Sequence, residues 1–317
     1  MATHTAIQSQ SALSSRNALL ENALASLSDI IVDKEEQLRL ALCCVLAGGH
    51  LLIEDVPGVG KTTMAHALAH VFGLSYQRIQ FTSDILPADV LGVSIFRRET
   101  SQFEFHRGPI FSQLVLADEI NRATPKAQSA LLEAMEERQV TADGSTYALP
   151  APFFVIATSN PTHQIGTFEL PESQLDRFLM RIQLGFPGAK AERILLANRE
   201  RRDMLEEIEP VMTIDTLVNL QSQVPAVFLS EALLDYVQAI IAFSRESGAF
   251  TTGLSPRAGI ALVRAAQASA ILAGHQGVHP EDVQFVLPSI VAHRLTPSSA
   301  DTPDDIGAYI LHSVPVP

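Results

Sequence analysis

The sequence predicts an α/β fold, in which a doubly wound parallel sheet is followed by a C-terminal all-α domain. Short apolar runs alternate with helical periodicity up to about Leu184, which is typical of central parallel strands. A Gly-rich turn joins the first of these runs to a helix. After Phe186-Pro187-Gly188 the apolar spacing is helical throughout. We therefore expect a disordered lead-in over residues 1–17, an α/β domain over 18–186 and a helical domain over 187–317.

Composition restricts the class of protein. The chain has 317 residues, 47% of them apolar, and a net charge of −13, which disfavours nucleic-acid partners. No apolar run approaches the roughly 20 residues that cross a bilayer, and the N-terminus lacks the apolar segment of a signal peptide. The adjacent Cys43 and Cys44 lie in an apolar helical run and indicate buried, reduced thiols. We expect a cytoplasmic protein without direct membrane insertion.

The sheet is predicted from five apolar runs. The expected strands cover residues 50–54, 76–80, 113–117, 153–158 and 180–184. Helical spacing predicts helices over residues 62–72 and 126–138, and another over 34–47 with Asp33 as its N-cap. Asp143-Gly144 predicts a hairpin turn within residues 140–150. A second hairpin is expected over residues 94–105, with residues 98–102 as its polar tip.

The second domain is predicted to be helical. Residues 233–243 and 257–272 have apolar positions at helical spacing. Ser255 is typical of an N-cap and Pro256 of a first helical position. A polar, Pro-containing loop over residues 296–305 precedes a last short helix.

The Gly-rich turn after the first strand has the pattern of a phosphate-binding loop. Its backbone N–H groups and the helix N-terminus would face a polyphosphate, and Lys61 would reach the outer phosphates. The Thr62 hydroxyl is a candidate Mg²⁺ ligand. Asp55 departs from the pattern, because it stands where these loops usually carry glycine. The candidate nucleotide-binding residues are Asp55, Val56, Pro57, Gly58, Val59, Gly60, Lys61, Thr62 and Thr63.

Polar side chains follow two later strands, and they are candidates for the chemistry. Asp118-Glu119 comes after the strand at 113–117, where Asp118 would hold Mg²⁺ and Glu119 would accept a proton from the attacking water. Asn160, after the strand at 153–158, could orient that water. Read singly, the acidic pair also suits a helix N-cap and Asn160 a turn before proline.

Two arginines complete the constellation. Arg177 lies in the sequence Asp176-Arg177-Phe178, and Arg257 stands in the first turn of a predicted helix, against the macrodipole. A cation in that position suggests an anionic partner such as a phosphate. Exposed salt bridges are the alternative explanation for each arginine.

The order of these motifs resembles the AAA+ ATPases. Finer strings resemble the MoxR family, among them residues 81–92, 108–111, 117–123 and 131–140. The resemblance implies a P-loop AAA+ sheet with a helical lid, ATP and Mg²⁺ as ligands, and Asp55 as a frequent residue of the loop.

The same resemblance implies roles for single residues. Lys61 and Thr62 would be Walker A residues, and Asp118 and Glu119 Walker B residues. Asn160 resembles sensor 1, and Arg257 resembles sensor 2, which closes the lid on nucleotide. Arg177 resembles the arginine finger that acts on ATP of a neighbouring subunit. Arg181, by contrast, alternates within a strand and is expected to be structural.

The expected function is a Mg²⁺-dependent ATPase ring, most simply a hexamer, that remodels or matures a partner protein in a chaperone-like way. The resemblance implies a von Willebrand factor A domain protein as partner and directs the two hairpins toward the pore and the partner. One alternative is the motor subunit of a metal chelatase. Others are a nucleic-acid motor and a nucleotide-gated scaffold without turnover.

Other polar residues are explained more simply. His66 and His70 lie four apart without a third ligand and fit a helix surface. His275 and His279 are interrupted by Gly277 and fit a loop. The basic pair at residues 97–98 fits a solvated turn.

Overall fold

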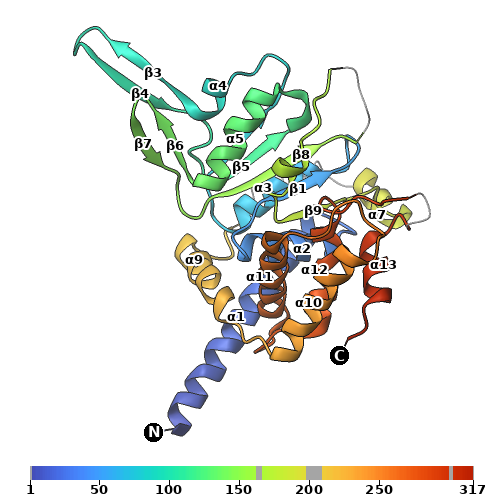
Figure 1. Ribbon diagram of the computed structural model, residues 1–317. Coiled ribbons are helices and arrows are strands. Elements are labelled where there is room, and N and C mark those ends of the chain that lie inside the picture. The colour runs from blue at the N-terminus through green and yellow to red at the C-terminus, as the bar shows by residue number, and fades with distance from the viewer. Residues whose placement is uncertain (1, 162–165, 198–208, 300–302, 317) are drawn as a thin grey trace.

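The computed structural model describes residues 2–161, 166–197, 209–299 and 303–316 (Figure 1). A five-stranded parallel sheet in the order β2-β5-β8-β1-β9 forms the centre of the first domain. Its strands are β1 (Leu51–Glu54), β2 (Tyr76–Gln80), β5 (Leu114–Asp118), β8 (Phe154–Ser159) and β9 (Met180–Ile182). All five predicted strands are therefore confirmed, with shifts of one or two residues at some ends.

Apolar side chains cover both faces of this sheet, because successive strand residues point to opposite sides. Leu114 and Leu116 pack into one core cluster with the early helices and the second domain. Val115 and Ala117 pack into another, which Leu131 and Leu132 of a covering helix complete. The sequence showed uninterrupted apolar runs for this reason. The helical elements of this part of the chain are α1 (Ala2–Ile30), α2 (Glu35–Leu46), α3 (Lys61–Val71), α4 (Pro87–Leu91), α5 (Pro125–Glu137), the short α6 (Glu172–Leu175) and the 3-10 turn η1 (Ile120–Arg122).

Two antiparallel hairpins extend from the first domain, as predicted (Figure 1). They pair β3 (Gly92–Arg97) with β4 (Gln102–Arg107), and β6 (Gln139–Ala142) with β7 (Ser145–Ala148). Asp143 and Gly144 both have positive φ, 49° and 75°, which matches the right-handed twist of hairpin strands. The β3-β4 hairpin carries the exposed pair Phe96 and Phe103, whose ring centroids lie 5.3 Å apart.

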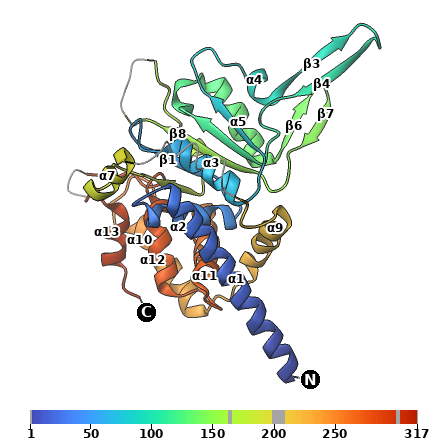
Figure 2. The same ribbon diagram turned by 180° about the vertical axis from the view of Figure 1, so that it is seen from behind.

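The N-terminal segment differs from the prediction. Where a disordered lead-in was expected over residues 1–17, α1 is helical from Ala2, and its first half extends away from the body (Figure 2). Its second half packs against the core through the buried side chains of Leu20, Ala23 and Leu27. A helix nucleated by that packing adds further turns at low cost, whereas composition alone indicated disorder.

The second domain is helical, as predicted. It contains α7 (Ala189–Ala197), α9 (Ile214–Gln223), the 3-10 turn η2 (Val224–Ala226), α10 (Glu231–Glu246), α11 (Pro256–Ala273), α12 (Pro280–Val291) and α13 (Ile306–Ser313). The Ser255 hydroxyl accepts a hydrogen bond from the Ala258 N–H, so the predicted N-cap is confirmed. The exact limits of the domains stay a prediction. No helix in the described ranges is long and apolar enough to cross a bilayer.

Side chains of the first domain hold the linker between β9 and α7. The carboxylate of Asp55 accepts from the Gly185 N–H at 2.6 Å, and Lys34 donates to the Phe186 carbonyl at 2.9 Å. Asp33 was expected to cap α2, but Lys34 occupies the N-cap position. The Asp33 carboxylate instead accepts from the Gly188 N–H at 2.7 Å.

Candidate active site

The carboxyl ends of β1, β5 and β8 meet at one edge of the sheet, as parallel strands require. A pocket of about 320 Å³ lies at this edge. It brings together most of the residues predicted for nucleotide, metal and catalysis. They are Pro57, Gly58, Gly60, Lys61, Thr62, Thr63, Asp118, Glu119 and Asn160.

The phosphate-binding loop forms one wall of this pocket. Gly58 and Gly60 have φ values of 86° and 98°, and a Cβ at either position would meet no atom within 4 Å, so the loop presents an open backbone. Gly60 caps α3, whose first residue is Lys61. Burial lowers the pKa of the Lys61 ammonium, while the nearby acidic side chains act in the opposite direction.

Asp55 does not line the pocket but holds the loop from behind. One carboxylate oxygen accepts from the Val56 N–H at 2.8 Å and the other from the Gly185 N–H at 2.6 Å. Its carbonyl oxygen accepts a hydrogen bond from Nζ of Lys61. The residue that departs from the usual loop pattern therefore connects the phosphate loop to the interdomain linker. Val56 and Val59 likewise lie outside the pocket lining.

Asp118 is buried and held by two neighbours. Its Oδ1 accepts from the Thr158 hydroxyl at 2.6 Å. Its Oδ2 accepts from Nε and Nη2 of Arg78 at 3.0 and 2.5 Å. Carboxylate and hydroxyl oxygens are the ligands that Mg²⁺ prefers, so Asp118 and Thr62 supply a suitable donor set.

Glu119 is held in a rarely adopted backbone conformation. Its φ and ψ are 57° and 48°, in the left-handed region, and its N–H donates to the Thr158 hydroxyl at 2.8 Å. Gln80 donates to its carboxylate at 2.9 Å, and Arg122 lies 3.2 Å from the same oxygen. These contacts hold the carboxylate of Glu119, which is one of the residues that line the pocket.

Asn160 follows β8 and lines the same pocket. Its backbone carbonyl accepts from the Asn121 side chain at 3.2 Å, which ties the end of β8 to the turn after β5. The structure thus places the predicted polar residue beside Glu119. Its role in orienting water stays a prediction.

Arg177 and Arg257 lie elsewhere, at a second pocket of about 240 Å³ that also borders Gly48 and His50. Glu136 joins the two arginines, with Nε of Arg177 at 3.1 Å from Oε2 and Nη2 of Arg257 at 2.9 Å from Oε1. The structure brings these two predicted residues together and separates both from the phosphate pocket.

The two pockets lie at opposite ends of the strands, the phosphate pocket at their carboxyl ends and the second pocket at their amino ends. Residues 48–50 precede β1 and the phosphate loop follows it, so the four residues of β1 separate them by roughly 13 Å. Both Arg177 and Arg257 line the second pocket, and neither is among the residues that line the phosphate pocket of its own chain. Arg181 forms an ion pair with Glu54 at 2.9 Å, as expected for a structural arginine.

Sequence reasoning missed four residues that shape these pockets, namely Arg78, Gln80, Glu136 and Thr158. Arg78 and Gln80 alternate along β2 around the buried Ile79, which placed them on one strand face. The alternation did not show which strand lies beside β2. Gln80 lies opposite Asp118 only because β2 pairs with β5. Thr158 lay inside an apolar run, where its hydroxyl was the only sign of a polar partner.

Comparisons with known proteins agree with this geometry. Residues 50–180 match the ATPase family associated with various cellular activities (AAA), and residues 242–308 match the AAA lid domain. The chain is 46% identical to the uncharacterized protein YeaC of Bacillus subtilis, over 87% of each chain. It is 36% identical to the chaperone MoxR1 of Mycobacterium tuberculosis, over 92% of this chain and 79% of that one. The chain belongs to the MoxR family of AAA+ ATPases.

The fold of this MoxR-family chain is shared with a solved structure. A predicted ATPase from Cytophaga hutchinsonii, known from a crystal structure, superposes with a TM-score of 0.87 at 32% identity, over 99% of both chains. The α/β domain with a helical lid is therefore confirmed. Membership of an ATPase family indicates nucleotide binding and ATP hydrolysis.

Proposed function

We propose that the chain is a Mg²⁺-dependent ATPase that works in a ring, most simply a hexamer, and uses hydrolysis to remodel or mature a partner protein. The observation that carries this proposal is the distance between the phosphate pocket and the paired Arg177 and Arg257. A charged group that is needed at the phosphate but lies at the opposite edge of its own sheet can act only on a neighbour.

The residues of one chain supply most of the chemistry. N–H groups of the loop and the Lys61 ammonium hold the phosphates, and Asn160 orients the attacking water. Glu119 accepts the proton of that water at its carboxylate oxygen. Thr62 and Asp118 would hold Mg²⁺, which supplies positive charge to the outer phosphates.

The neighbouring chain would add the missing positive charge. Glu136 keeps Arg177 and Arg257 side by side in the free chain. Against a neighbour, both guanidinium groups would face the γ-phosphate, where negative charge grows during transfer. This proposal replaces the expectation that Arg257 closes the lid on nucleotide of its own chain.

The partner is proposed from relatives. MoxR1 of Mycobacterium tuberculosis is named a chaperone. The β3-β4 hairpin extends from the body with exposed aromatic side chains, as a contact with another protein requires (Figure 1). We propose a protein partner, with a von Willebrand factor A domain protein as the first to test.

Mixing two inactive variants tests action between subunits. Lys61→Ala removes the phosphate contact, and Arg177→Ala removes the neighbour's cation, so each variant alone should lose nearly all turnover. Random mixing in equal amounts should restore about a quarter of the wild-type rate, because a quarter of the interfaces join an intact pocket to an intact arginine.

A matched control uses two defects within one pocket. A mixture of Lys61→Ala with Glu119→Gln should recover nothing, since no pocket in it is complete. If the Lys61→Ala and Arg177→Ala mixture also stays inactive while both variants assemble by light scattering, Arg177 does not act between subunits.

A further inference from the structure

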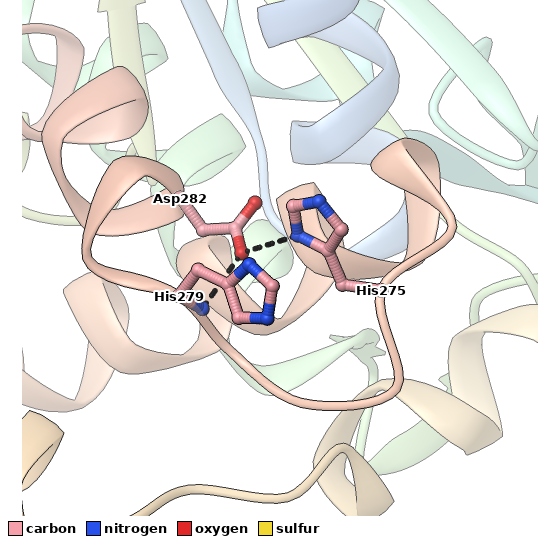
Figure 3. A group of neighbouring side chains, drawn as sticks. All are labelled: His275, His279 and Asp282. Carbon is pink, nitrogen blue, oxygen red and sulfur yellow. Dashed lines mark hydrogen bonds and ion pairs between the residues drawn. The ribbon is translucent and has the colours of Figure 1, made fainter.

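The helical domain brings together three metal-ligating side chains that the ATPase chemistry does not use. They are His275 and His279, in the loop after α11, and Asp282, in the first turn of α12 (Figure 3). We propose that they bind one divalent transition-metal ion, with Zn²⁺ as the ion that fits best.

The ligand atoms already lie close to one another. One ring nitrogen of each histidine and a carboxylate oxygen of Asp282 are all within 4.8 Å. Nδ1 of His275 lies 3.0 Å from Oδ2 of Asp282. The two imidazole rings are stacked, with centroids 4.1 Å apart and planes inclined by 22°.

These distances need only small movements to become a coordination sphere. Zn–N bonds of about 2.0–2.1 Å at tetrahedral angles place ligand atoms about 3.4 Å apart. Rotation of exposed or half-buried imidazoles can therefore close the remaining gaps, and a water molecule can fill the fourth position.

The carboxylate is held as a metal ligand usually is. Asp282 is 3% exposed, its Oδ1 accepts from the Ser269 hydroxyl at 2.9 Å, and its Oδ2 accepts from the backbone N–H of His279 at 2.9 Å. Such hydrogen bonds fix the direction of a ligand before the ion arrives. A buried carboxylate also favours a cation beside it, because its charge is poorly solvated there.

The donor set selects the ion. Two imidazole nitrogens and one carboxylate oxygen suit Zn²⁺, Co²⁺ or Ni²⁺, whereas Mg²⁺ prefers oxygen ligands in octahedral geometry. None of the three residues lines the phosphate pocket. The proposed site therefore differs from the Mg²⁺ site in place and in chemistry, and it would join the end of α11 to the start of α12.

The test uses full-length, nucleotide-free protein that has been stripped with a chelator. Zn²⁺ titration by calorimetry should give one ion per chain, and Co²⁺ should give the visible absorption of a four- or five-coordinate site. Zn²⁺ should raise Tm, because an ion that binds only the folded chain stabilises it. His275→Gln and His279→Gln should each weaken Zn²⁺ binding at least about tenfold and abolish the rise in Tm.

The chain offers a matched control in His66 and His70. They form the other close histidine pair in the described residues, with Nε2 atoms 3.2 Å apart, but no carboxylate completes the group. His70→Gln should leave Zn²⁺ binding unchanged. The proposal is overturned if the wild type binds no Zn²⁺ at micromolar concentrations, or if the folded His275→Gln and His279→Gln variants bind Zn²⁺ as tightly as the wild type. It is also overturned if binding is lost only with His70→Gln.

Discussion

Replacing Thr158 by valine should damage the active site without changing its shape. The Thr158 hydroxyl lies between the two acidic residues, donating to Asp118 at 2.6 Å and accepting from the Glu119 N–H at 2.8 Å. Valine has the same branching, and Thr158 is fully buried, so no water replaces the lost partner. The substitution therefore removes two hydrogen bonds and little else.

The magnitude follows from these two bonds. A hydrogen bond to a charged carboxylate contributes about 1.5–3 kcal/mol, and a buried N–H left without an acceptor costs about 1–3 kcal/mol. Burial of the added methyl group offsets part of this by about 1 kcal/mol. We expect the free energy of unfolding to fall by about 2–4 kcal/mol, and turnover or Mg²⁺ affinity to fall by about 10–100-fold.

Urea unfolding and steady-state ATP hydrolysis measure the two effects. Thr158→Ser keeps the hydroxyl and should retain most of the activity. Thr141→Val makes the same exchange on the exposed β6-β7 hairpin, where Thr141 lies 3.4 Å from Thr146, and should change stability by less than about 0.5 kcal/mol. A Thr158→Val protein with wild-type stability and turnover would refute the reasoning.

Three further outcomes can be measured directly. Glu119→Gln should bind ATP normally but hydrolyse it about 10²–10⁴-fold more slowly, and unchanged turnover would remove Glu119 as the base. Burial, which removes water from the charged imidazolium, lowers the pKa of His50 from 6.5 to about 4, and the neutral ring accepts a hydrogen bond at Nδ1 from the Val155 N–H. The unfolded chain then binds the extra proton, so the free energy of unfolding should fall by about 2 kcal/mol from pH 7 to pH 5. In a His50→Gln variant the free energy of unfolding, measured with urea at each pH, should depend less on pH. Gly49→Ala should cost about 1–3 kcal/mol, since its Cβ would lie 2.4 Å from Cβ of Leu179; a wild-type Tm would contradict this.

Local signals were enough to predict the framework of the molecule. Buried strands such as β5 and β8 are uninterrupted apolar runs, and the turn at Asp143-Gly144 needs residues that tolerate positive φ. These features depend on neighbours along the chain. The phosphate pocket was predictable for the same reason, because its parts are a loop and the ends of strands whose direction the fold class fixes.

Contacts between distant segments could not be predicted in this way. Glu136 and Arg257 are 121 positions apart, and helical spacing showed only that Glu136 lies off the apolar stripe of α5. Nothing in either segment indicates that they meet. The expected position of Arg257 at its own nucleotide followed from a family role, and the arrangement of this lid separates it from that pocket.

The sequence of α12 contains residues that favour a helix and one residue that disfavours it. Pro280 at the first helical position and Asp282 in the first turn are typical of a helix start. Pro288, inside the same segment, argues against a helix because it lacks an N–H donor. Without α12, Asp282 could not be placed beside the two histidines, which were correctly predicted to lie in a loop.

The linker between the domains also limits motion of the lid. Three side chains, those of Asp55, Lys34 and Asp33, hold backbone groups of residues 185–188. At about 1 kcal/mol each, breaking all three costs about 3 kcal/mol, so a chain with a fully released lid makes up less than about 1% of the ensemble. A ligand can populate that state only if it binds it more tightly by a comparable free energy. Asp55 also forms part of the phosphate loop, so a nucleotide that changes the contacts of Asp55 would shift the orientation of the lid, and the linkage would act equally in both directions.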